Sequence, residues 1–162
     1  MDTERDQGRN TSFSRNEVCF LSLGDARTAY YGYTQPKHQL LADYLRHFQS
    51  LIDVMDHYGA SIGEDRAFLD KAGILMEESP PSEGRSGYSE LMLQYNVRKS
   101  LAARNRSIAL SFLKRAYKPR YGTLWTDLEN QYTRGTDQYP RYLTAAYNML
   151  LNFKRQDVRE VR

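Results

Sequence analysis

The chain has 162 residues, the length of one domain, and 40% of them are apolar. That share is enough for a modest helical core, but no stretch approaches the roughly 20 apolar residues that span a membrane. The N-terminus is polar and lacks the apolar core of a signal peptide, and the single cysteine, Cys19, cannot form an internal disulfide. We therefore expect an intracellular, cytoplasmic protein without a membrane partner.

The net charge of +3 conceals a difference between the two halves of the chain. Residues 1–85 carry 14 Asp and Glu against 9 Lys and Arg, whereas residues 86–162 carry 6 against 14. Such an asymmetry indicates a partner for the basic half, and nucleic acid is the usual candidate.

The first 35 residues are expected to form a flexible or partly ordered N-terminal segment. Residues 1–17 mix charged residues with Gly, Asn and Ser, which is typical of a disordered tail. The short apolar run over residues 18–23 is consistent with either a strand or a helix fragment. Residues 28–36 are interpreted as a connector that ends at Pro36.

Helices are predicted over most of residues 36–156, the expected folded domain, which a tail over residues 157–162 follows. Apolar residues that alternate at spacings of three and four predict the first helix over about residues 38–58. The further predicted helices are 65–76, broken near Gly73; 88–117, as one helix or two; 120–133; and 144–155, with a linker over about 77–87. No segment shows strand alternation, so the expected fold class is all-α, a compact bundle of about five helices.

The apolar faces of these helices supply the expected core. The predicted core residues are Phe48, Ile52, Phe112, Leu124, Trp125, Leu128 and Leu150. Trp125 and Tyr132 can also serve as platforms on which bases stack, although an aromatic residue on an apolar stripe more often packs in the core.

The sequence has no pattern that is typical of a catalytic or metal site. One cysteine and three scattered histidines do not provide the clustered ligands of zinc, and nucleophile elbows and phosphate-binding glycine loops are missing. Asp43 and His47, like Asp53 and His57, are spaced four residues apart on a helix, as a metal-binding or acid–base pair can be, but this spacing more often belongs to an exposed polar pair. We therefore expect no enzyme, no cofactor, no metal and no small-molecule substrate.

Residues 98–120 are the most informative segment, because they include eight basic residues and no acidic one. At about 100° per residue, most of these basic residues lie across one broad face of a helix. Such a face can neutralise the phosphates of a nucleic acid without sequence specificity. Alternatively, the basic face is a solvated helix surface, or it pairs with the acidic half of the chain. The predicted nucleic-acid-binding residues are Lys99, Arg104, Arg106, Lys114, Arg115, Lys118 and Arg120.

Two blocks of the sequence carry a family resemblance. The C-terminal block consists of residues 120–135 (RYGTLWTDLENQYTRG), 137–140 (DQYP) and 143–152 (LTAAYNMLLN), and the upstream block of residues 44–59 (YLRHFQSLIDVMDHYG) and 61–65 (SIGED). Both blocks resemble the Gag polyprotein of copia-type LTR retrotransposons, with the versions from microbial eukaryotes most similar. The resemblance spans roughly residues 38–155, and the order and spacing of helix-core positions carry it, since no single motif is diagnostic.

The resemblance implies a capsid-like helical domain that self-associates into shells around RNA and has no catalytic residues. Copia-type Gag usually continues into a zinc knuckle of three Cys and one His, which is missing here, and the front of the capsid domain is either absent or replaced by residues 1–35. These departures imply a truncated or domesticated copy. The expected function is a non-enzymatic structural protein that binds itself and, weakly and non-specifically, RNA. The alternatives are a small basic-face module for nucleic-acid or protein interaction unrelated to capsids, and an enzyme of unrecognised type.

Overall fold

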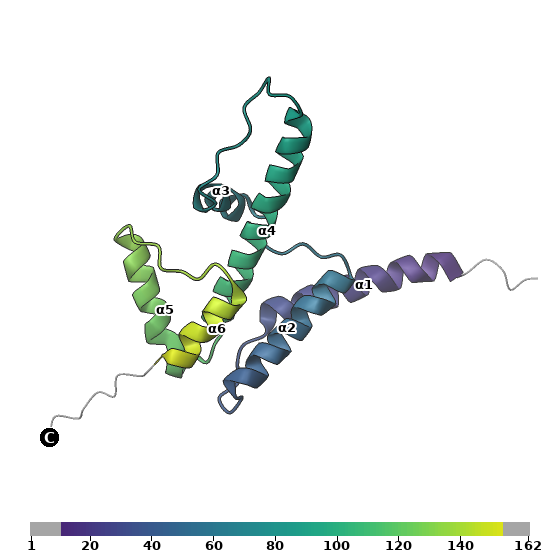
Figure 1. Ribbon diagram of the computed structural model, residues 1–162. Coiled ribbons are helices and arrows are strands. Elements are labelled where there is room, and N and C mark those ends of the chain that lie inside the picture. Colours follow the sequence, from purple (N-terminus) through teal and green to yellow (C-terminus); the bar gives the residue numbers. More distant parts are fainter. Residues whose placement is uncertain (1–10, 154–162) are drawn as a thin grey trace, which may run out of the picture. The chain divides into compact units, whose positions relative to one another are not determined.

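The computed structural model describes residues 11–153, and the side chains of residues 22–153. The described residues contain six helices and no strand, which confirms the predicted all-α fold class with one helix more than the expected number. The helices are α1 (Thr11–Gly32), α2 (Leu41–His57), α3 (Arg66–Leu75), α4 (Tyr88–Lys114), α5 (Lys118–Thr133) and α6 (Leu143–Asn152) (Figure 1). None of the described helices combines the length and the apolar character needed to cross a membrane.

Helix α1 is the main departure from the predicted elements. Residues 11–17, expected to belong to the disordered tail, are helical, and so is the apolar run over residues 18–23. The connector expected over residues 28–36 begins only after Gly32. The apolar residues of α1 form almost no amphipathic stripe, and that stripe is the signal on which helix prediction depends.

The other helices differ from their predicted bounds by a few residues. Helix α3 continues through Gly73, where a break was expected, and α4 is one helix, not two. Pro119 lies in the first turn of α5, where its missing N–H costs no helical hydrogen bond. Residues 154 and 155, the predicted end of the last helix, lie outside the described residues.

The chain divides into two units, the first consisting of Met1–Tyr33 with Arg46–Ser61. In this unit the buried rings of Tyr30 on α1 and Phe48 on α2 lie with their centroids 5.5 Å apart. The rings of Tyr33 and His47 are stacked at 4.1 Å, and Ile52 is buried further along α2. Aromatic packing therefore joins the end of α1 to α2.

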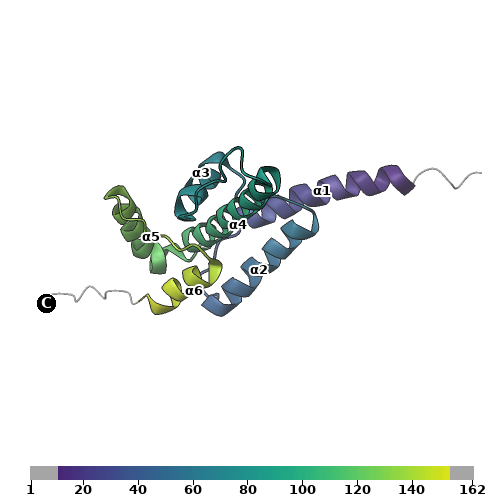
Figure 2. The same cartoon turned by 45° about the horizontal axis from the view of Figure 1, so that its top comes forward.

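The second unit consists of Thr34–Leu45 with Ile62–Arg162, and α4 is its centre. Helices α3, α6 and, less extensively, α5 pack on α4; α3 lies beside its middle, and α5 and α6 lie nearer its C-terminal end (Figures 1 and 2). The ring of Tyr44 is stacked on that of Phe112 at 4.5 Å, and its hydroxyl donates a hydrogen bond to the Phe112 carbonyl oxygen at 2.8 Å. The Gln35 N–H likewise donates to the Arg115 carbonyl oxygen, so residues 34–45 cover the C-terminal end of α4.

The loop before α3 approaches the backbone of α4 at Gly63. The φ angle of Gly63 is +75°, in the left-handed region that favours glycine. A Cβ at this position would lie 2.9 Å from the Ala103 carbonyl oxygen and 2.9 Å from the Ser107 Cβ. Both the conformation and the lack of space therefore require glycine.

The predicted core residues are mostly buried. Phe48 and Ile52 are buried in the first unit, and Phe112, Leu128 and Leu150 in the second. Leu124 and Trp125 are only half-buried, and they lie on α5, whose contact with α4 is less extensive than that of α3 or α6.

Candidate functional site

The seven basic residues predicted on one face do not share one environment, and Arg106 is the clearest exception. It is only 5% exposed, and its Nη2 lies 3.0 Å and 2.7 Å from the two carboxylate oxygens of Asp137. Its guanidinium carbon is 5.9 Å from the ring centroid of Tyr139. Arg106 therefore lies inside the second unit and not on an exposed face, because the loop between α5 and α6 covers that side of α4.

Asp137 connects three parts of the second unit. Its carboxylate binds Arg106 of α4, lies 3.6 Å from the Nζ of Lys71 on α3, and accepts a hydrogen bond of 3.2 Å from the backbone N–H of Tyr139. Lys71 in turn lies over the ring of Tyr132 on α5, 5.4 Å from the centroid. One carboxylate thus joins α3, α4 and the α5–α6 loop, and Lys71 extends the group to the end of α5.

Tyr139 lies among aromatic rings beside this ion pair. Its ring centroid is 5.5 Å from that of Trp125 and 5.6 Å from that of Tyr132. Burial raises the pKa of the Tyr139 hydroxyl above its ordinary value, and the negative charges of Glu129 and Asp137 raise it further. Trp125 is half-buried and Tyr132 is 46% exposed, so neither ring lies in the fully buried core, and base stacking on them stays a prediction.

Three of the remaining predicted basic residues are half-buried. The aliphatic part of Lys99 lies against Gly73 of α3, with Cδ and Cε each 3.7 Å from where a Gly73 Cβ would be. Arg104 lies beside the close approach of Gly63, and Arg115 lies at the end of α4. These three residues are therefore neither buried like Arg106 nor fully exposed.

Lys114, Lys118 and Arg120 are exposed where α4 ends and α5 begins, and we call these three residues the basic corner. Lys114 and Lys118 line a pocket of about 360 Å³ that Trp125 also lines. The Nζ of Lys114 is 5.9 Å from the Trp125 ring centroid, while the indole N–H donates to Glu129 at 2.7 Å. The basic corner is the part of the predicted basic face that stays open to solvent.

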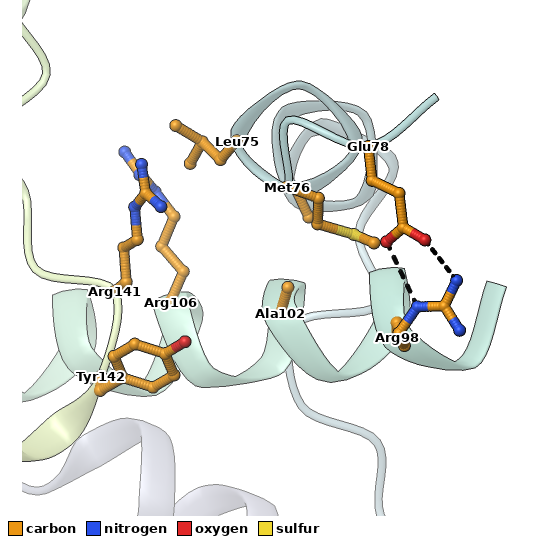
Figure 3. A pocket seen from close by; sticks show the side chains of 9 residues that line it. Leu75, Met76, Glu78, Arg98, Ala102, Arg106, Arg141 and Tyr142 are labelled. Carbon is orange, nitrogen blue, oxygen red and sulfur yellow. Dashed lines mark hydrogen bonds and ion pairs between the residues drawn. The ribbon is translucent and has the colours of Figure 1, made fainter. Parts of the chain in front are cut away.

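A second pocket, of about 320 Å³, lies between α3, α4 and the segment before α6 (Figure 3). Its lining is apolar on one side and cationic on the other: Ala72, Leu75, Met76, Ala102, Arg106, Arg141 and Tyr142, with the Glu78–Arg98 ion pair at one end. In the view of Figure 3, the side chains of Arg106 and Arg141 extend towards the same side of the pocket. Since Glu78 and Arg106 are already engaged in ion pairs, the pocket offers shape and an apolar wall more than reactive groups.

The first half of α4 carries a feature that the sequence patterns did not indicate. Leu93, Val97 and Leu101 are 60%, 62% and 55% exposed, and their spacing of four residues aligns them along the helix. Glu90, which is exposed, and Arg104, which is half-buried, extend this row at its two ends. We call these five residues the α4 stripe.

Within residues 22–153, no three His, Cys, Asp or Glu side chains gather in a way that could hold a metal ion. Neither of the two pockets brings a histidine to a hydroxyl or thiol nucleophile. Comparisons of the chain with protein-family models, with curated proteins and with solved structures find no match.

Proposed function

We propose that the chain is a non-enzymatic, Gag-like structural protein of retrotransposon origin that associates with itself. The α4 stripe is the observation that supports self-association. Single exposed apolar side chains are common on protein surfaces, but Leu93, Val97 and Leu101 form one continuous row. Exposure of such a row to water is unfavourable, and contact with a second apolar surface removes the row from water. The resemblance of residues 38–155 to copia-type Gag supports the origin.

Association of the full chain with itself is tested by sedimentation velocity and light scattering over a range of protein concentrations. The proposal expects the mean mass to rise with protein concentration in the absence of RNA. A helical module unrelated to capsids would stay monomeric and change mass only when RNA is added. Monomers at every concentration, up to several hundred micromolar, would exclude the proposed function.

Weak, non-specific RNA binding is the second part of the proposal, and the basic corner supports it. Lys114, Lys118 and Arg120 are exposed cations within one helical turn of the α4–α5 junction, next to the half-buried ring of Trp125. Three phosphate contacts on single-stranded RNA correspond to a slope of about two log units of affinity per log unit of salt. Affinity should therefore be low at physiological salt and should fall further as salt is raised.

Replacing the three residues of the basic corner with glutamine tests that assignment. The salt slope should become shallower by up to about two units, because those phosphate contacts are removed. The matched control removes the same charge from three exposed cations elsewhere: Lys37, Arg85 and Arg134. Equal losses of RNA affinity in the basic-corner variant and in the control would show that only net charge matters. Unchanged RNA binding by the basic-corner variant would exclude the basic corner as the RNA site.

A further inference from the structure

The α4 stripe is symmetric about Val97 in both spacing and chemistry. Leu93 and Leu101 lie four residues before and after it, and Glu90 and Arg104 lie seven residues before and after it. With about 100° and 1.5 Å per residue, all four fall within about 40° of Val97 around the axis and span about 21 Å. The row is therefore straight, apolar in the middle, acidic at one end and basic at the other.

This symmetry fits a second copy of the same row. If two α4 helices lie antiparallel on a two-fold axis at Val97, each residue before Val97 faces the residue equally far after it in the other copy. Leu93 then packs on Leu101, and Glu90 faces Arg104, so apolar groups meet apolar groups and opposite charges meet twice. A parallel pair would instead place Glu90 against Glu90 and Arg104 against Arg104, which repels.

We propose that the α4 stripe binds a second copy of this chain, through an antiparallel contact of two α4 helices centred on Val97. The inference rests on the proposed function, for which it names the surface, the partner and the register. The Oε1 of Glu90 accepts a hydrogen bond of 3.0 Å from the Gln94 amide of the same helix, which holds the carboxylate at the exposed surface of α4. One helix pair is smaller than a standard interface of about 800 Å² per partner, so the dimer should be weak and concentration-dependent.

The first test replaces the residue on the axis. Val97→Glu places two like charges against each other in the dimer, and we expect at least a tenfold weaker association by sedimentation velocity of the full chain. The fold should survive, because Val97 is exposed, and the melting curve by circular dichroism should match that of the wild type. Ile74→Glu is the matched control, since Ile74 is 71% exposed on α3 and lies outside the α4 stripe; its association should not change.

The second test addresses the antiparallel register. Glu90→Arg and Arg104→Glu should each weaken dimerisation, because each places like charges face to face. The double variant exchanges the two charges, so association should return towards the wild-type strength. Failure of the double variant to recover, with its helical spectrum intact, would overturn the antiparallel arrangement.

The outcomes separate this inference from the function on which it rests. If the Val97→Glu protein associates as strongly as the wild type, the surface is elsewhere and the inference is wrong, while self-association stands. If the wild type never associates, both are wrong. If Val97→Glu lowers the melting temperature without changing association, another part of the same chain covers the α4 stripe. If two copies associate only when RNA is added, RNA is required for the contact. Either result contradicts a direct contact between two copies.

Discussion

The two halves of α4 differ in how the rest of the second unit surrounds them. Over residues 88–101 only Tyr95 is buried, and Leu93, Val97 and Leu101 face solvent. Over residues 103–114 six residues are buried, on several sides of the helix. The residue types are similar in both halves, so the neighbours decide the role of each side chain. The C-terminal half of α4 therefore packs within the second unit, and its N-terminal half exposes a row of apolar side chains.

The largest expected effect is a loss of stability on truncation in the buried half. Phe112 is fully buried and stacked on Tyr44, so Phe112→Ala should lower the free energy of unfolding by about 3–5 kcal/mol. Leu101→Ala in the exposed half should change it by less than about 0.5 kcal/mol. Urea denaturation of both variants, at concentrations where the chain is monomeric, measures the contrast. Similar losses of stability in Phe112→Ala and Leu101→Ala would contradict the distinction between a buried and an exposed half of α4.

The ion pair that holds the buried half should give the next largest effect. Asp137→Ala removes the carboxylate that pairs with the Arg106 guanidinium, and the Arg106 side chain is only 6% exposed. The free energy of unfolding should therefore fall by about 2–4 kcal/mol. The control, Glu78→Ala, breaks the exposed Glu78–Arg98 pair and should cost less than about 1 kcal/mol. Thermal and urea melts of the two variants compare them. A cost for Asp137→Ala as small as that of the control would mean that Arg106 finds water when its partner is removed.

Gly63, where the loop before α3 meets the buried half, should show a smaller loss. Gly63→Ala combines an unfavourable positive φ with a Cβ 2.9 Å from the Ala103 carbonyl oxygen, and we expect a cost of about 1–3 kcal/mol. Gly84 also has a positive φ, +86°, but nothing lies within 4 Å of the position of its Cβ. The difference between Gly63→Ala and Gly84→Ala in urea denaturation therefore isolates the crowding. Equal costs would show that the loop moves away from α4 without penalty.

The smallest expected effect concerns Tyr139 at alkaline pH. Its pKa is raised in the folded state, so the folded state holds the hydroxyl proton more tightly than the unfolded chain does. The resulting stabilisation is complete below the ordinary pKa of 10.0 and is lost as the pH rises through the raised pKa. Stability of the wild type should then fall more steeply above about pH 10 than that of Tyr139→Phe. Parallel slopes in urea denaturation across that pH range would contradict the shift.

The helical fold was accessible from the sequence where apolar spacing is regular. Helix α2 follows a clear three-four pattern, and its predicted core residues Phe48 and Ile52 are buried. Helix α1 was not predicted, because its sequence shows little amphipathic periodicity. The central position of α4 was also not foreseen, since a helix contacted on several sides has no single apolar face.

The candidate site was accessible from the sequence only in part. Lys114, Lys118 and Arg120 are exposed, as a basic face requires, but nothing local distinguishes them from Arg106. Arg106 is buried because Asp137, 31 residues away, reaches it through the α5–α6 loop, and only the tertiary structure shows that pairing. The spacing around Val97 was present in the sequence, but its meaning depends on one uninterrupted α4 with that side exposed.

If two copies pair through the α4 stripe as proposed, the two-fold symmetry of that contact limits how far assembly through it can proceed. A self-complementary patch is used up when two copies meet, so this contact alone produces closed pairs and cannot grow into a shell or a filament. A larger particle then needs a second contact surface on each copy. Particle growth should then proceed by addition of pairs, and an excess of a chain altered only at Val97 should leave growth through the second surface intact while preventing closure of the lattice.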